Sequence, residues 1–434
     1  MDQTLVRRFR EEVADTLARQ RRQDAVAGVP PMTGEDERQF ARAVINRVLD
    51  AYARAEIAAG RTPPTGEEEE ELAAGIHAAL YGVGRLQPLL DDPDVENVDI
   101  NGCDHVFVQY ADGREVVAEP VADNDDELVE LVQILGAYSG LSSRPFDSAN
   151  PQLDLRLPDG SRLSAVMDVC SRPAVSIRRA RLARVHLDDL LGYGSISEET
   201  AAFLSAAVAA RKNIMIAGAT NAGKTTLLRA LANEIPPAER LVTVERALEL
   251  GLGEFPDLHP NVVAFEERLP NSEGMGAISM AELVRRSLRM NPSRVIVGEV
   301  LGDEIVTMLN AMSQGNDGSL STIHANSSVE VFNRIATYAI QSVERLPVEA
   351  TMMLIAGAID FVVFVEKHND YAAGGRLRRY VKSVREINGV DGRVLSSEIF
   401  APGPEGVAVP AAPIACMDEL VAVGYRPYAE RWSA

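Results

Sequence analysis

One stretch of the sequence decides the fold: Asn213-Ile214-Met215-Ile216-Ala217 runs directly into Gly218-Ala219-Thr220-Asn221-Ala222-Gly223-Lys224-Thr225-Thr226. The first five residues are a short apolar run typical of a buried strand, and Leu227, Leu228 and Leu231 continue at helical spacing. The second segment fits G-x-x-x-x-G-K-[ST], and a strand before it with a helix after it distinguishes a P-loop from a chance glycine turn. The sequence therefore predicts a P-loop in an open α/β sheet.

The residue types of this loop indicate phosphate chemistry. Glycine lets the backbone approach phosphate closely, and N–H groups at the start of a helix point at the anion with the helix dipole behind them. Lys224 would reach the β and γ phosphates of ATP, and the Thr225 hydroxyl would bind Mg²⁺. We therefore assign nucleotide binding to residues 218–226, with Lys224 also in a catalytic role and Thr225 as a metal ligand.

Three further segments place a polar side chain at the end of an apolar strand. Arg294-Val295-Ile296-Val297-Gly298-Glu299 ends in a carboxylate, which beside a P-loop is expected to hold Mg²⁺ or orient water. Leu241-Val242-Thr243-Val244-Glu245 ends in another, with Glu249 four residues later, and Leu320-Ser321-Thr322-Ile323-His324 ends in a histidine. Ligands of open α/β sheets bind at the carboxyl ends of strands, so these ends are expected near the P-loop. Taken singly, each remains compatible with a structural or solvated side chain.

Periodicity divides the chain into four parts: a helical region at 1–90, a small α/β domain at 91–182, a linker at 183–197 and a nucleotide-binding domain at 198–434. Helical spacing dominates the first part, with a turn expected at Gly28-Val29-Pro30-Pro31. The second part alternates short strands with one helix. Helices alternating with buried strands fill the last part, a pattern that predicts a parallel sheet.

Two stretches late in the chain are compositionally distinct. Residues 401–413 are rich in Pro, Ala and Gly, so we expect a surface loop there, followed by a last helix at 417–423. The longest apolar run, at 352–365, contains Asp360 and is shorter than the roughly 18 residues needed to cross a bilayer. No membrane span is therefore expected.

Composition restricts the function classes. The chain has 434 residues, of which 46% are hydrophobic and 25% charged, as in soluble globular proteins. Its net charge of −21 disfavours nucleic acid as a partner. The one sizeable basic cluster in the second half, Arg285, Arg286 and Arg289, is expected to be a subunit contact or a solvated helix face. Three widely separated cysteines fit neither a disulfide framework nor a metal site, which favours the cytoplasm.

The order P-loop, Glu245, Glu299, His324 resembles the ATPases of type II and type IV secretion systems, whose boxes are Walker A, an Asp box, a Gly-Glu Walker B and a His box. Longer blocks look like the CpaF/TadA-like branch, which powers tight-adherence (Tad) pili. These blocks are Val98-Asp99-Ile100-Asn101-Gly102, residues 154–162, Ser176-Ile177-Arg178-Arg179, Ile296-Val297-Gly298-Glu299-Val300, residues 318–327 and Gly424-Tyr425-Arg426-Pro427.

The resemblance implies a RecA-like P-loop ATPase domain preceded by a small, PAS-like α/β domain, assembled as a ring hexamer. It implies that hydrolysis of ATP with Mg²⁺ drives an inner-membrane platform protein from the cytoplasmic side and so assembles pilin or moves protein. Glu245 and Glu299 carry over as catalytic or water-orienting acids, with Glu299 also beside the metal. His324 carries over as a residue that senses the state of the nucleotide.

The resemblance also implies that Arg156, Arg162, Arg178 and Arg179 reach the phosphates. Guanidinium groups suit this role because they make bidentate phosphate contacts. The other interpretation of each arginine is that it only stabilises the small sheet or remains solvated.

Three positions depart from the pattern of the family. Arg246 stands where an aspartate is usual, Leu301 replaces an arginine, and Asn316 replaces a histidine. Arg246 would either lower the affinity for Mg²⁺ or pair harmlessly with Glu249. These departures keep open a divergent paralogue that binds ATP, hydrolyses it weakly and acts as a regulatory subunit. A third hypothesis, a translocase of nucleic acid, requires a basic pore that the net charge disfavours.

Overall fold

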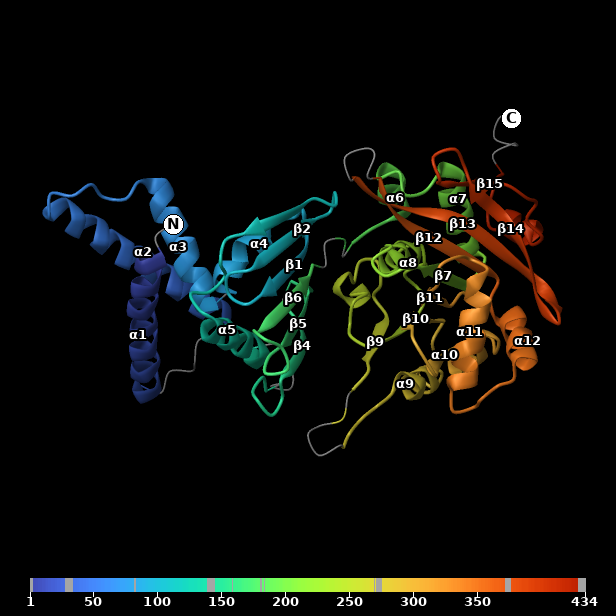
Figure 1. The fold of residues 1–434 in the computed structure, drawn as a ribbon, viewed down its shortest axis with the longest axis horizontal. Coiled ribbons are helices and arrows are strands. Elements are labelled where there is room, and N and C mark those ends of the chain that lie inside the picture. The colour runs from blue at the N-terminus through green and yellow to red at the C-terminus, as the bar shows by residue number, and fades with distance from the viewer. Residues whose placement is uncertain are drawn as a thin grey trace. The chain divides into compact units, whose positions relative to one another are not determined.

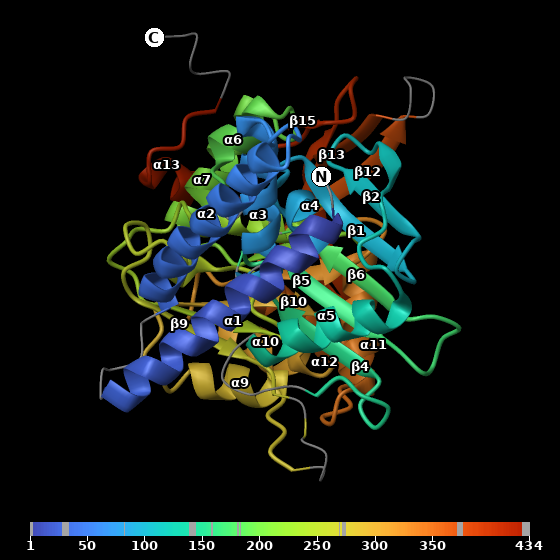
Figure 2. The ribbon, with the colours of Figure 1, turned by 90° about the vertical axis from the view of Figure 1, so that its left-hand side faces the viewer.

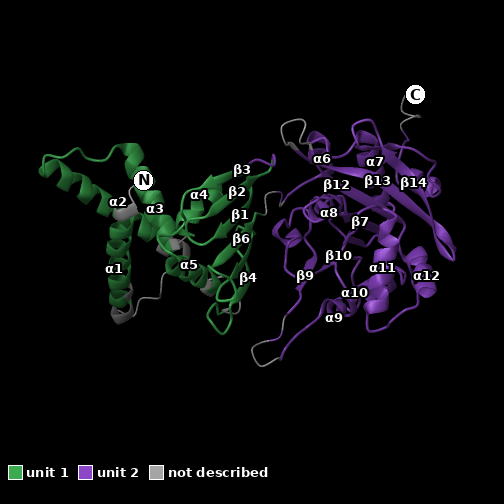
Figure 3. Cartoon of the chain, viewed as in Figure 1, with its two compact units in different colours: residues 1–111, 115–179 green, residues 112–114, 180–434 purple. Residues whose placement is uncertain are grey.

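The computed structural model describes residues 3–27, 34–81, 83–138, 145–157, 159–179, 182, 184–268, 270, 275–370 and 376–427. The chain divides into two compact units, shown in green and purple in Figure 3. Unit 1 comprises residues 1–111 and 115–179, and unit 2 comprises residues 112–114 and 180–434. The helical region and the small α/β domain expected from the sequence thus cluster together in unit 1.

Unit 1 begins with three helices, α1 (Gln3–Ala27), α2 (Gly34–Ala58) and α3 (Gly66–Tyr81), which pack against one another (Figure 2). Their apolar faces bury Phe9, Ile45 and Ile76. Burial of one apolar stripe per helix is what the helical spacing predicted. The turn expected at residues 28–31 lies outside the described residues.

The rest of unit 1 is an antiparallel sheet with helices. Its elements are η1 (Gly84–Leu86), α4 (Gln87–Asp91), β1 (Val95–Asn101), β2 (Val106–Tyr110), β3 (Glu115–Ala118), α5 (Asp125–Tyr138), β4 (Gln152–Arg156), β5 (Arg162–Val166) and β6 (Ala174–Arg178). The described strands are ordered β3-β2-β1-β6-β5-β4. Helix α5 packs Leu128 and Val132 onto the same core as Val98, Leu163 and Ile177. Alternate residues of the strands therefore form a second, more polar face.

Unit 2 is an α/β domain built on a mixed sheet (Figure 1). Its elements are α6 (Leu187–Gly192), α7 (Glu198–Ala209), β7 (Ile214–Gly218), α8 (Lys224–Ala232), β8 (Leu241–Glu245), η2 (Leu252–Glu254), β9 (Val262–Glu266), α9 (Met280–Ser287), β10 (Arg294–Val300), α10 (Glu304–Met312), β11 (Leu320–His324), α11 (Glu330–Gln341), α12 (Val348–Ala358), β12 (Phe361–Asp370), β13 (Arg376–Asp391), β14 (Arg393–Pro402), β15 (Ala408–Pro410) and α13 (Met417–Ala422). The described strands are ordered β15-β14-β13-β12-β7-β11-β10-β8-β9.

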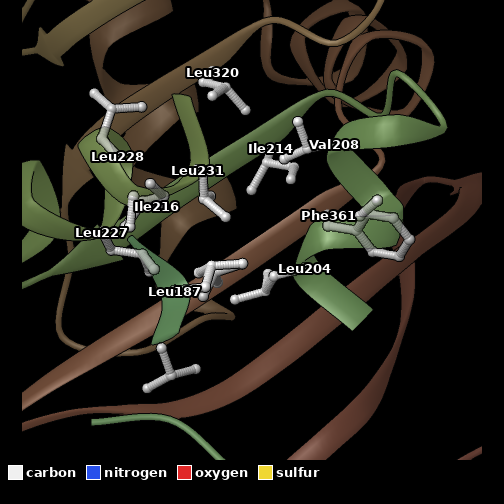
Figure 4. Close-up of a cluster of buried hydrophobic side chains, with 14 of the residues drawn as sticks. Leu187, Leu204, Val208, Ile214, Ile216, Leu227, Leu228, Leu231, Leu320 and Phe361 are labelled. Atoms are coloured by element: carbon white, nitrogen blue, oxygen red, sulfur yellow. The ribbon is translucent and has the colours of Figure 1, made fainter. Parts of the chain in front are cut away.

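Apolar side chains fill cores on both faces of the parallel part of this sheet. Along β7, Ile214 and Ile216 belong to one core and Met215 and Ala217 to the other. Figure 4 shows the first core, where Ile214 and Ile216 lie among side chains from α7, α8 and β12. Burial on both faces explains why these strands read as continuous apolar runs rather than alternating ones.

Residues 183–197, which we expected to be a linker, are part of the folded unit 2. They contain helix α6, which begins with a capping box between His186 and Asp189. Val185, Leu187 and Leu190 are buried in the core of unit 2. The prediction was wrong because a six-residue helix is too short to show a hydrophobic period. Residue 183 itself lies outside the described residues.

The end of the chain also differs from the prediction. Strands β12, β13, β14 and β15 are antiparallel neighbours, so the parallel pattern ends at β12. The expected loop at 401–413 contains β15, which adds an edge to the sheet. The apolar run 352–365 is divided between α12 and β12, and none of the helices in the described ranges is both long and apolar enough to cross a membrane.

His259 makes the stability of unit 2 depend on pH. The ring is buried, with Nε2 at 2.8 Å from Asn233 Oδ1, and Asn233 in turn donates to Val185 O at 2.7 Å. Burial lowers the pKa of His259; the charge on Asp257 opposes this effect and His186 adds to it. Asp257 is itself paired with Arg184. The folded state therefore favours the neutral ring.

We predict that this histidine contributes stability above pH 6.5 that is lost in acid. As the pH falls, the unfolded chain binds the proton first, because the pKa of His259 is lower in the folded state. The contribution is thus complete above the unfolded value and declines as the pH falls through the folded one, by at most about 1.4 kcal/mol per pH unit. Thermal unfolding of wild type and His259→Gln between pH 7.5 and 5 checks this. If the unfolding temperatures of the two proteins fell in parallel as the pH was lowered, the prediction would be contradicted.

Candidate nucleotide-binding site

The P-loop joins β7 to α8 in a backbone conformation that requires its glycines. Gly223 has φ = 97°, in the left-handed region, directly before α8 begins. Gly218 ends β7, and a Cβ atom placed there would lie 2.5 Å from the backbone oxygen of Val365 in the adjacent strand. Only glycine therefore lets β12 approach the loop this closely. Residues 218–226 are all described and follow the predicted strand, loop and helix.

Three of the predicted residues form one chain of close polar contacts beside the loop. Lys224 Nζ lies 3.0 Å from Ala219 O and 3.1 Å from His324 Nδ1. His324 Nε2 lies 2.9 Å from Glu299 Oε1, and Lys224 Nζ lies 3.7 Å from the same oxygen. The strand order β7-β11-β10 explains this meeting, because parallel neighbours end at the same edge of the sheet.

The protonation state of His324 follows from this chain. Burial and the charge of Lys224 lower the pKa of the ring, while Glu299 opposes the shift. With the ring neutral, Nδ1 accepts a hydrogen bond from Lys224, and the proton on Nε2 lies on the side of Glu299, whose Oε1 is 2.9 Å away. These contacts, not an observed hydrogen, assign the tautomer. His324 therefore connects the lysine of the P-loop to the carboxylate on the next strand.

Glu245 lies in the same edge of the sheet, but its carboxylate is committed to the backbone. It is buried and accepts hydrogen bonds from the N–H groups of Glu249 at 2.7 Å and Leu250 at 2.8 Å, and from the Thr243 hydroxyl at 3.2 Å. Burial raises its pKa. A Cβ atom on Gly298 would lie 3.0 Å from Glu245 Cγ, so the glycine of the Gly-Glu pair makes room for this side chain. The arrangement indicates that Glu245 shapes the loop after β8.

Glu249 is the acidic residue that this loop places beside the P-loop. The Thr225 hydroxyl donates to its carboxylate at 3.4 Å. The sequence places Glu249 four residues after Glu245, and it is not among the residues expected in the site. Its position four residues after Glu245 was the available signal, because the backbone N–H groups that Glu245 binds begin at Glu249.

The donor set fits Mg²⁺ held together with a nucleotide rather than in a protein cage. Among the described residues, no group of three or more His, Cys, Asp or Glu side chains could hold a metal ion alone. The site offers few protein oxygens to a metal ion. They are the Thr225 hydroxyl, the Glu249 carboxylate beside it and the Glu299 carboxylate near Lys224. Mg²⁺ in phosphoryl-transfer sites takes one or two carboxylates and completes its shell with phosphates and water.

Arg379, on β13, also contacts the P-loop and was missed by sequence reasoning. Its Nε donates to Asn221 O at 2.9 Å, and its Cδ lies 3.7 Å from where a Cβ atom on Gly223 would be. No motif marked it, because it comes from a strand that runs antiparallel to β12 and reaches the loop only through the register of that pair.

The arginines expected to reach the phosphates do not all lie together. Arg156, Arg162 and Arg178 are direct cross-strand partners on β4, β5 and β6 of unit 1. They lie on the face away from the core, because the neighbouring Leu163 and Ile177 point into it. Like charges opposite one another repel, so an anion over this row would stabilise it.

Arg179 is not part of this arginine row. Its Nη1 donates to the carbonyl oxygens of Leu89 at 3.2 Å and Asp92 at 2.9 Å, and its Nε lies 3.6 Å from Asp159. These contacts join β6 to the α4 region within unit 1. They indicate a structural role, the other interpretation considered for these arginines.

The departures from the family pattern have local partners. Arg246 lies 3.7 Å from Glu267 and 3.8 Å from Glu304. Glu304 also accepts the N–H of Leu301 at 2.6 Å. The side chain of Asn316 donates to Ala311 O and so belongs to the turn before β11.

Comparison with known proteins matches residues 81–375 to the family described as "Type II/IV secretion system protein". A putative conjugal transfer protein of Mycobacterium tuberculosis (strain ATCC 25618 / H37Rv) is 33% identical over 335 residues, covering 75% of this chain and 90% of the relative. The type IV secretion system protein VirB11 of Brucella suis is 30% identical over 315 residues, covering 65% of this chain and 84% of the relative.

Solved structures of two ATPases also match this chain. The VirB11 ATPase of the Brucella suis type IV secretion system, in complex with sulphate, is 28% identical with a TM-score of 0.36, and the match covers 68% of this chain and 90% of that one. The Legionella pneumophila ATPase DotB is 17% identical with a TM-score of 0.49, and the match covers 70% of this chain and 79% of that one. The family match includes the P-loop, Glu249, Glu299 and His324, and ends before Arg379.

Proposed function

Because the chain belongs to the type II/IV secretion system protein family, we propose that it is an ATPase that powers assembly of a Tad-type pilus or secretion of protein. The observation that carries this proposal is the chain of close polar contacts from Lys224 through His324 to Glu299 beside the P-loop. It joins a phosphate-binding cation to a carboxylate able to orient water. A protein that only binds nucleotide does not need this second group.

Each residue of the site has a distinct role in the proposed hydrolysis. The N–H groups of the P-loop and the Lys224 ammonium bind the phosphates, and Glu299 orients the attacking water. Bound Mg²⁺ would neutralise charge on the β and γ phosphates, with Thr225 and Glu249 as its protein partners. His324 contacts both Lys224 and Glu299, so a change at the phosphates reaches the carboxylate. The arginine row is our candidate for phosphate contacts outside the P-loop.

The Tad assignment and the partners rest on the resemblance of the sequence blocks. The blocks around residues 98–102, 154–162 and 318–327 look like the CpaF branch, whose members act as hexamers on inner-membrane platform proteins. We therefore propose a homo-hexamer at the cytoplasmic face of the membrane that binds such a platform and no nucleic acid. Arg285 and Arg286 on α9 and Arg289 just after it are exposed, and we propose that they form a subunit contact or a solvated surface.

The structure provides no specific support for the weakly hydrolysing paralogue. Arg246, the departure closest to the site in sequence, pairs with Glu267 and Glu304. This leaves Glu249 with its contact to Thr225. The departures therefore have local contacts of their own, and the residues of the proposed mechanism keep theirs.

Oligomer mass and phosphate release test the proposed function. We expect the purified protein to hydrolyse ATP only with Mg²⁺, and to reach six times the mass of one chain in light scattering with a nonhydrolysable ATP analogue. AMP in place of the analogue is the matched control. A monomer that binds ATP without releasing phosphate would contradict the proposed ATPase function. Failure to bind any nucleotide would contradict the assignment of the nucleotide-binding site.

A further inference from the structure

Arg229 lies on α8, four residues after Thr225, and its guanidinium is buried among backbone carbonyls. Nη1 donates to Leu182 O at 2.9 Å and Nε to Leu250 O at 3.2 Å, while Nη2 donates to Glu249 O. The residue is 8% exposed. Residues four apart share one face of a helix, so Thr225 and Arg229 both face the loop that follows β8.

The same two residues of the loop are held from the other side. Glu245 accepts the N–H groups of Glu249 and Leu250, whose carbonyl oxygens bind Arg229. Both the donors and the acceptors of this short segment are therefore fixed by the buried side chains of Glu245 and Arg229. The backbone of Glu249 has little freedom, and its carboxylate lies within 3.4 Å of the Thr225 hydroxyl.

We propose that Arg229 is a positioning residue that holds Glu249 against Thr225 and so sets the response of the site to Mg²⁺. The inference rests on the proposed function, because it concerns how the carboxylate beside the phosphate-binding loop is placed. Arg229 itself does not belong to the P-loop, and its hydrogen bonds reach backbone oxygens rather than the side chains of the site. It acts through Glu249.

A double-mutant cycle tests this role. We compare wild type, Arg229→Met, Glu249→Ala and the double variant by kcat, KM, the Mg²⁺ concentration for half-maximal activity and affinity for a fluorescent ATP analogue with and without Mg²⁺. Arg229→Met should lower kcat by about 10- to 100-fold, the scale of a misplaced catalytic group. It should weaken Mg²⁺-dependent binding of the analogue and leave binding without Mg²⁺ within about twofold. In the Glu249→Ala background, Arg229→Met should have no further effect.

Two further variants separate positioning from general stability. Arg240→Met is the matched control, because Arg240 also donates to a backbone carbonyl, that of Met290, away from the P-loop. Arg229→Lys keeps one charged donor, so it should fall between wild type and Arg229→Met, and it completes the cycle if the methionine variant does not fold. Equal losses from Arg229 substitution in both backgrounds would overturn the proposal, as would equal losses in Arg240→Met. A wild type that binds ATP without hydrolysis, by contrast, would refute the proposed function.

Discussion

Lys224→Ala is expected to abolish ATP-dependent phosphate release while unit 2 remains folded. Lys224 begins α8, and its ammonium is the cation of the chain that includes His324 and Glu299. Removing it takes away the charge that we propose binds the β and γ phosphates, and it leaves His324 Nδ1 without this donor. Loss of one such group costs at least about 10²- to 10³-fold in turnover.

Steady-state phosphate release with saturating ATP and Mg²⁺ measures this loss, and circular dichroism melting reports the fold. Lys382→Ala is the matched control, because Lys382 is a half-exposed lysine of the same unit that pairs with Glu366. The control should keep wild-type turnover. Unchanged turnover in purified Lys224→Ala would remove the P-loop from the mechanism.

The elements around the P-loop were predictable because their signals are local. A continuous apolar run, a glycine-rich turn and a helical period within 213–231 are enough to specify β7, the loop and α8. Strand ends carry the same kind of information, so Glu299 and His324 could be assigned before their distance was known. The strand order β7-β11-β10-β8 then brings those ends to one edge.

The different contacts of Glu245 and Glu249 could not be predicted from their residue type. Both are glutamates after the same strand, but one carboxylate is bound by N–H groups of the loop and the other lies beside Thr225. Which carboxylate meets the backbone depends on the path of the loop, which also depends on Arg229 in α8. A tertiary arrangement of this kind leaves no period in the sequence.

The arginines and the end of the chain show the same limit. Arg178 and Arg179 are neighbours in sequence, but successive residues of an extended chain point to opposite faces, and only Arg178 is in register with Arg162. Likewise, an apolar strand looks the same whether its partner is parallel or antiparallel. The pairing of β12 with β13, which delivers Arg379 to the P-loop, therefore required the structure.

Glu299→Gln is expected to separate ATP binding from hydrolysis. Glutamine has nearly the same shape and its oxygen can still lie beside His324 Nε2, so the fold and the position of Lys224 should persist. The amide carries no negative charge and cannot orient or deprotonate water as a carboxylate does. We therefore expect phosphate release to fall by at least about 10²-fold, with affinity for ATP unchanged or higher.

The matched control for this variant is Glu266→Gln, because Glu266 ends the edge strand β9 and its side chain is exposed. Phosphate release and binding of a fluorescent ATP analogue are measured on wild type and both variants. Only Glu299→Gln should lose turnover, and it should retain bound ATP after a single-turnover mixing experiment. Equally negligible release from wild type and Glu299→Gln, with ATP still bound by both, would instead favour the regulatory paralogue, since a carboxylate that performs no chemistry can be neutralised without consequence.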